Sequence, residues 1–141
     1  MATVDVTAGQ VLRKANNALN TVVGLLWAAV GATPANVSKA TIGNNAIQFQ
    51  DHPYMPTGSA VTLGNVIVYA LGAGPDKAYP NGPMGAHERA HTLQGEILGL
   101  LYLPLHLASQ AYSYARTGTY DRANPLEIGP NSNPPRPWPW A

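Results

Sequence analysis

The run His87-Glu88-Arg89-Ala90-His91 constrains the fold more than any other part of the chain. On an α-helix, residues four positions apart lie about 40° apart around the axis, so His87 and His91 would project two imidazoles from one face. An extended segment gives this spacing no such convergence. The run therefore requires a helix with one face open to a cleft.

The residues around this run independently predict a helix from about Met84 to Tyr102. Apolar side chains fall on one broad arc of the helical wheel and polar side chains on the other, with the two histidines at the border. We expect Pro104 to end or kink this helix and to begin a second one that stops at Gly118. The apolar arc contains Ala90, Leu93, Ile97, Leu98, Leu100 and Leu101, and the polar arc contains Arg89, Thr92 and Glu96.

The sequence pattern in the first part of the chain predicts another helix. Between Thr7 and Gly31, apolar residues recur at spacings of three and four, with Thr7 as a candidate N-cap and Gly31 as a stop. We interpret this pattern as a scaffold helix whose apolar stripe faces the core. Residues 32–57 are rich in Asn, Gly and Pro, apart from a short strand-like piece at Ile47 to Phe49, and are expected to be mostly irregular.

A small sheet is predicted in the middle of the chain. The β-prone runs 59–63 and 66–71 flank Gly64-Asn65, a pair typical of a tight hairpin. Residues 71–85 contain several Gly and Pro and predict a loop into the next helix. The expected fold class is thus α+β and zincin-like, with helices packed on a small antiparallel sheet.

Length and composition favour one domain. The 141 residues suit a single domain over 1–141, with the Pro- and Trp-rich tail 129–141 irregular but packed on it. The formal charge is +1 and the basic residues are scattered, which argues against nucleic-acid binding. The longest apolar stretch, Val22 to Val30, is too short to insert in a membrane and is not a signal peptide.

The chain contains no cysteine, so any metal must be held by histidines and carboxylates. His87 and His91 are the candidate ligands of Zn²⁺. Glu88 lies about 100° from His87 and about 60° from His91 on the wheel, off the line of ligation but within reach of a metal-bound water. The pattern predicts a zinc metallopeptidase with Glu88 as catalytic base, acting on a peptide or protein substrate.

A catalytic zinc site needs a third protein ligand. Ile97 occupies the position where a metzincin has its third histidine, which excludes that class. Glu96 lies about 180° from His87 on the same helix and cannot turn back to the metal. The carboxylates left after the motif are Asp121 and Glu127. We prefer Glu127, because its apolar neighbours suggest an inward carboxylate that a metal would satisfy.

Asp121 is the alternative ligand. Gly118-Thr119-Tyr120-Asp121 resembles the start of the GTxD element that supplies an Asp ligand in aspzincins. The resemblance is partial, because Asn124-Pro125 stands where that element has Tyr-Gly.

Several other side chains are candidates for the surroundings of the site. Gln94 lies within about 20° of His87 on the wheel and is a candidate contact to a ligand or substrate, or equally an amide that packs the helix. Tyr120 is a candidate donor to the reaction oxyanion, in competition with other tyrosines at 102, 112 and 114. We interpret His106 as an interfacial histidine and assign no role to His52.

Much of the chain, from about Thr21 on, resembles the metallopeptidase effector domains at the C-terminus of some type VI secretion spike proteins of the VgrG kind. The similarity is most specific over residues 87–104, which include the HExxH run and the following Leu101-Tyr102-Leu103-Pro104. It extends to residues 59–67 and to the tail at 134–138.

This resemblance implies an antibacterial toxin, cytoplasmic in the producing cell, that a VgrG spike carries into the periplasm of a neighbouring cell. It also implies a cognate immunity protein and zinc held by two His and a Glu, here His87, His91 and Glu127. No spike domain precedes Met1, so we expect an excised domain or a free-standing relative. The other interpretations are a zinc-containing binding module without turnover and a purely structural metal site, which would need four closed ligands.

Overall fold

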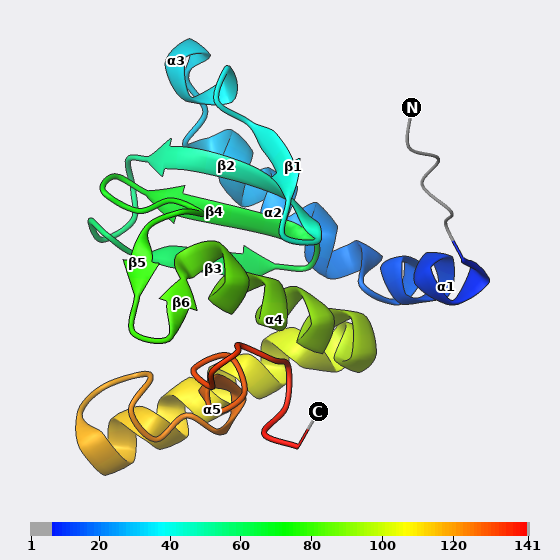
Figure 1. Ribbon diagram of the computed structural model, residues 1–141. Helices are drawn as coiled ribbons and strands as arrows, with labels where there is room; N and C mark the ends of the chain where they lie inside the picture. The colour runs from blue at the N-terminus through cyan, green and yellow to red at the C-terminus, as the bar shows by residue number, and fades with distance from the viewer. Residues whose placement is uncertain (1–6, 141) are drawn as a thin grey trace.

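The computed structural model describes residues 7–140 and contains a four-stranded sheet with helices on both faces (Figure 1). The strand order is β1-β2-β4-β3. The strands are β1 (Thr41–Gly43), β2 (Ala46–His52), β3 (Ala60–Leu63) and β4 (Val66–Ala70). Gly64 at φ 66° supports the turn between β3 and β4, so the predicted hairpin is confirmed.

The α+β class is confirmed, but the sheet is mixed where we expected an antiparallel one. β2 runs parallel to β4, with Ile47 opposite Val66 and Phe49 opposite Val68. The other two pairs, β1 with β2 and β3 with β4, are antiparallel. β2 and β4 are therefore the two inner strands, β4 is the more central in the core, and β3 forms one edge of the sheet.

Central strand β4 divides the core into two layers. Val66 and Val68 point to one face and pack with Ala28 of helix α2 (Ala18–Val30). Ile67 and Tyr69 point to the other face and pack with Met84, the first residue of helix α4 (Met84–Leu98). This alternation is the period of two of a strand that is buried on both faces. Helices α2 and α4 thus cover opposite faces of the sheet (Figure 1).

The predicted helix from Thr7 to Gly31 is two helices, α1 (Ala8–Asn16) and α2, which meet at Asn17. Thr7 caps α1 as expected, with its side chain accepting from the Gln10 amide. The predicted orientation of the apolar stripe is wrong. Helix α2 turns Asn20, Gly24 and Ala28 to the sheet and leaves its large aliphatic residues exposed.

Glycine explains the orientation of α2. A Cβ at Gly24 would lie 2.5 Å from the carbonyl oxygen of Leu63, so the helix backbone sits directly on the β3–β4 turn. Only small or polar side chains fit that approach. The large residues of α2 must therefore occupy its opposite face.

Helix α4 ends earlier than expected. It stops at Leu98, and a single 3-10 turn η1 (Gly99–Leu101) joins it to helix α5 (Tyr102–Thr117). The break is at Gly99, whose φ of 56° suits glycine, and Pro104 lies inside the first turn of α5, where its missing N–H is harmless. Gly118 ends α5 in the left-handed conformation, as predicted.

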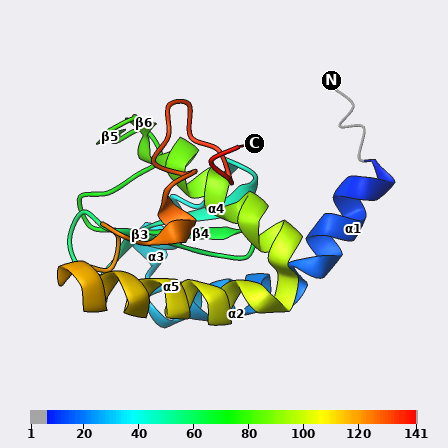
Figure 2. The ribbon, with the colours of Figure 1, turned by 90° about the horizontal axis from the view of Figure 1, so that it is seen from below.

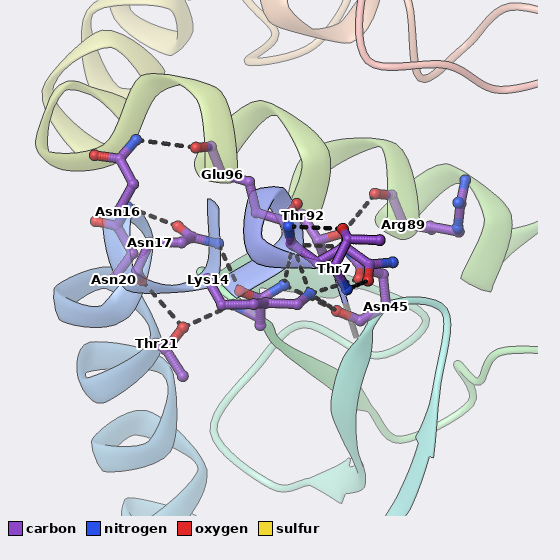
Figure 3. A network of polar contacts seen from close by, with 12 residues as sticks. Thr7, Lys14, Asn16, Asn17, Asn20, Thr21, Asn45, Arg89, Thr92 and Glu96 are labelled. Atoms are coloured by element: carbon purple, nitrogen blue, oxygen red, sulfur yellow. Dashed lines mark hydrogen bonds and ion pairs between the residues drawn. The ribbon is translucent and has the colours of Figure 1, made fainter. Parts of the chain in front are cut away.

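A polar network joins α1 and the start of α2 to the back of α4 (Figure 3). Glu96 is buried and accepts from Lys14, Asn45 and Asn65. The Asn16 amide donates to the carbonyl oxygen of Glu96 at 2.9 Å, and the Asn20 amide donates to that of Gly99 at 2.8 Å. These bonds satisfy carbonyls that the end of a helix leaves without partners.

The remaining elements lie beside helix α4 or at the far end of the sheet (Figure 1). Residues 71–85, expected as a loop, include a small hairpin of β5 (Ala78–Tyr79) and β6 (Gly82–Pro83). Helix α3 (Pro34–Val37) precedes β1 in the stretch expected to be irregular. The segment after α5 contains the 3-10 turn η2 (Pro125–Glu127) and returns across α4 (Figure 2). None of the helices described is both long and apolar enough to span a membrane.

Candidate metal centre

Helix α4 and turn η2 bring three potential metal ligands to one point. His87 Nε2 and His91 Nε2 lie 3.2 Å apart. Glu127 places Oε2 3.1 Å from His87 Nε2 and Oε1 3.3 Å from His91 Nε2. Both histidines are buried and the glutamate is half-buried. His87, His91 and Glu127 therefore form a group that could hold a metal ion, and we call them the metal triad.

Local sequence explains how Glu127 reaches the helix. The Asn124 side chain accepts from the amide of Leu126 at 2.9 Å and caps the turn η2 that begins at Pro125. Leu126 is buried and anchors the turn against the body of the protein. The structure thus places Glu127, the preferred candidate, beside the two histidines. Asp121 lines the same pocket but does not belong to the triad.

Without a metal, the triad is an ion pair. Burial on its own would lower the pKa of His91, but the charge and hydrogen bond of Glu127 raise that pKa to about 9. Burial would raise the pKa of Glu127, and the two histidines hold it well below its usual value. These opposite shifts are those of an ion pair, so a cation that binds here would have to displace a proton from His91.

Gln94 fixes the tautomer of His91. Its side-chain amide donates to the carbonyl oxygens of Leu126 and Pro137, both at 2.8 Å. Its Oε1 is consequently the acceptor for His91 Nδ1, also at 2.8 Å. With the Nδ1 proton held there, the lone pair of a neutral His91 lies on Nε2, which faces the triad. Gln94, a candidate from its position near His87 on the helical wheel, thus contacts His91 in the structure.

Glu88 lies beside the triad and is hydrogen-bonded to the sheet. It is buried, and its Oε2 accepts a 2.6 Å hydrogen bond from the hydroxyl of Thr62 in edge strand β3. The Tyr102 hydroxyl in turn donates a 3.3 Å hydrogen bond to the main-chain carbonyl oxygen of Thr62. Glu88 is therefore positioned by both the helix and the sheet.

A pocket of about 190 Å³ opens in front of these residues. Its floor is formed by the metal triad and Glu88, one wall by residues 58–62 before and within β3, and another by α5. Tyr79 of the β5–β6 hairpin stacks at a tilt on His87, with 4.8 Å between the ring centroids. The pocket is polar where the triad lies and is bordered by a strand edge.

Three residues of this pocket were missed or misjudged from the sequence. Thr62 looked like an ordinary strand residue, and Tyr79 fell in a predicted loop. His106, interpreted as interfacial, lines the pocket, with its ring 5.9 Å from that of His91 and stacked on Tyr102. Burial and the His91 charge lower the pKa of His106 to about 4, so it is neutral at physiological pH.

The structure does not bring every candidate to the site. Tyr120 is 61% exposed and stacks on Tyr114, outside the pocket lining. His52 is buried behind the sheet, where its Nε2 donates to the Trp27 carbonyl at 2.9 Å and its Nδ1 accepts from the Tyr54 amide. His52 is thus a satisfied core histidine.

Comparison with known proteins adds no relative to this description. No family model matches the chain, and no curated protein or solved structure is significantly similar to it. The class that the residues themselves define is an α+β domain with a His-His-Glu group able to hold a metal.

Proposed function

We propose that the protein is a zinc-dependent peptidase. The observation that carries this proposal is the metal triad with a buried carboxylate, Glu88, next to it in an open pocket. Two imidazoles and one carboxylate form the ligand set of a catalytic zinc site that keeps a position for water.

The spacing of the triad supports zinc. Ligand atoms about 2.0 to 2.1 Å from a tetrahedral zinc lie about 3.3 Å from one another. His87 Nε2 and His91 Nε2 lie 3.2 Å apart, and each also lies within 3.3 Å of one of the two carboxylate oxygens of Glu127. His87 Nδ1 is buried and has no hydrogen-bond partner among residues 7–140, and its ring packs against Tyr79. A bound zinc would polarise the substrate carbonyl and lower the pKa of a water molecule.

Glu88 is the general base in this proposal. Thr62 occupies Oε2, which leaves Oε1 to accept a proton from the attacking water. As the water oxygen bonds to the carbonyl carbon and the C–N bond breaks, Glu88 passes that proton to the leaving amine nitrogen. Tyr79 and His106 take the place of Tyr120 as candidate donors to the oxyanion, because both line the pocket.

The edge of the sheet offers a site for an extended substrate. β3 pairs with β4 on one side only within the described sheet, and residues 58–62 border the pocket beside Glu88. A peptide added to this edge as a strand would pass the triad with its backbone hydrogen-bonded to β3. The substrate class is accordingly a peptide in extended conformation.

The resemblance to type VI effector domains supports a narrower proposal. The peptidase would be an antibacterial effector that acts in the periplasm of a target cell, with an immunity protein in the producer. Growth of target cells that export the chain to the periplasm tests this, with Glu88→Gln as the matched inactive control. Equal toxicity of both proteins would contradict it.

The decisive experiment for the activity combines metal analysis with turnover. We expect one zinc per chain in the purified protein and in Glu88→Gln and Asp121→Asn, and less than a tenth of that in Glu127→Gln. Cleavage of an unfolded protein substrate should fall about 10²–10⁴-fold in Glu88→Gln. A zinc-free wild type, or undiminished cleavage by Glu88→Gln, would overturn the proposal. A wild type that contains zinc and binds the protein substrate without cleaving it would favour the non-catalytic binding module.

A further inference from the structure

Helix α2 exposes an apolar face that the rest of the described chain does not cover. Its large aliphatic residues are between 40% and 63% exposed, although their spacing is that of a core-facing stripe. The neighbouring turn η1 packs against α2 and adds two exposed leucines. We call this set the α2 face; it consists of Leu19, Val22, Val23, Leu25, Leu26, Val30, Leu100 and Leu101.

The α2 face is too large to be ordinary surface. At their exposed fractions, its eight residues present on the order of 800 Å², above the roughly 300–600 Å² of the largest apolar patch on a typical monomer. The same area is about what each partner buries in a stable dimer. The face therefore has the size of an interface.

The charge distribution fits an apolar partner. The sequence contains no Asp, Glu, Lys or Arg from residue 15 to 38, nor from 97 to 115. A second copy can meet this face without like-charge repulsion. An anionic membrane surface is a poorer match, because membrane-bound amphipathic helices carry Lys and Arg along the apolar border.

The order of residues along α2 favours a second copy specifically. Four aliphatic residues of α2 are arranged symmetrically about a point between Val22 and Val23. A leucine lies three positions beyond each valine, at Leu19 and Leu26. In an antiparallel pair of helices around a two-fold axis at that point, Leu19 of one chain faces Leu26 of the other. This reciprocity is the property of an isologous interface.

We propose that the protein forms a two-fold dimer through the α2 face, with the two α2 helices antiparallel. Helix α4, which carries His87 and His91, covers the face of the sheet opposite to α2 (Figures 1 and 2), so the metal triads would lie outside such an interface. The dimer is independent of the peptidase activity.

Light scattering and sedimentation of the full chain over a concentration series test the dimer. We expect about twice the 14.9 kDa monomer mass for wild type and a folded monomer for Leu26→Glu. Leu71→Glu is the control, since Leu71 is 49% exposed at the end of β4, outside the α2 face, and should stay dimeric. A monomeric wild type at all concentrations, whether or not it binds another protein or vesicles, overturns the proposal.

Disulfide trapping tests the orientation, because the chain has no cysteine of its own. An equimolar mixture of Leu19→Cys and Leu26→Cys should give the mixed disulfide as the main product. Each variant alone should cross-link poorly, since seven residues separate the thiols by about 10 Å along the axis, beyond disulfide reach. Efficient linkage of each variant with itself, and none between the two, would overturn the antiparallel arrangement.

Discussion

The hydroxyl of Thr62 donates a 2.6 Å hydrogen bond to the carboxylate of Glu88 and so connects the edge strand β3 to the helix of the metal triad. The strand that would bind the substrate thereby also holds the proposed base. On the proposed mechanism, the placement of the substrate backbone and the proton transfer would be coupled through the side chain of Thr62.

Replacement of Thr62 by valine should slow catalysis while leaving the metal in place. Valine has the same shape without the hydroxyl, so it leaves Glu88 Oε2 unpaired in a buried position. We expect kcat to fall about tenfold, zinc content to be unchanged, and Thr62→Ser to restore most of the rate. A serine variant as slow as the valine variant would show that the hydrogen bond has no part in the effect.

Replacement of Gln94 by leucine should weaken metal binding. The change removes the acceptor of His91 Nδ1 and two donors to the segment that carries Glu127. Loss of such supporting contacts typically lowers metal affinity about 10–100-fold. Competition with a chromogenic chelator measures the effect, and Tyr120→Phe, a change at an exposed residue outside the pocket, should retain the wild-type affinity.

Metal binding should strengthen with pH. Because Glu127 raises the pKa of His91 to about 9, a proton must leave His91 before a cation can bind. Between pH 6.5 and 9, we expect the release of this one proton from His91 to raise the apparent metal affinity about tenfold per pH unit. A pH-independent affinity would contradict the ion pair.

The metal-free protein should show the opposite trend in stability. A histidine with a raised folded-state pKa contributes stability fully below its unfolded value of 6.5 and loses that contribution as pH rises through about 9. The lowered pKa of Glu127 contributes above 4.5 and is lost in acid. Urea unfolding in the presence of a chelator should therefore give the largest contribution of this pair between about pH 4.5 and 6.5.

Replacement of Glu96 by leucine should destabilise the fold at a distance from the triad. Burial would raise the pKa of Glu96, but hydrogen bonds from Lys14, Asn65 and Asn45 lower it. Leucine leaves these donors without their acceptor, and we expect a loss of about 2–4 kcal/mol in the free energy of unfolding. Ile97→Ala, at the exposed neighbouring position, should change it by less than about 1 kcal/mol.

The sequence predicted the local features well, because each has a short-range physical cause. The HExxH helix, the Gly64 turn and the Gly118 stop depend on residues within one or two turns. Glu127 could be reached by elimination because few carboxylates follow the motif. Gln94 followed from the helical period.

The features that sequence analysis missed depend on contacts between distant segments. No local pattern shows which strand β2 will pair with, and its parallel pairing with β4 spans residues 53–65, which include strand β3. Tyr79 reaches His87 only through the fold of a hairpin. The apolar period of α2 correctly indicated a helix, but the side that meets the sheet was decided by Gly24 against the Leu63 carbonyl.

The return of the C-terminal segment across α4 has a consequence for biosynthesis. His87, Glu88 and His91 leave the ribosome well before Glu127, and Gln94 finds its partner at Pro137 only near the end of the chain. A nascent or prematurely terminated chain thus has the helix but not the complete ligand set. On the proposed mechanism, a chain truncated before Glu127 would therefore lack a complete metal site and hydrolytic activity.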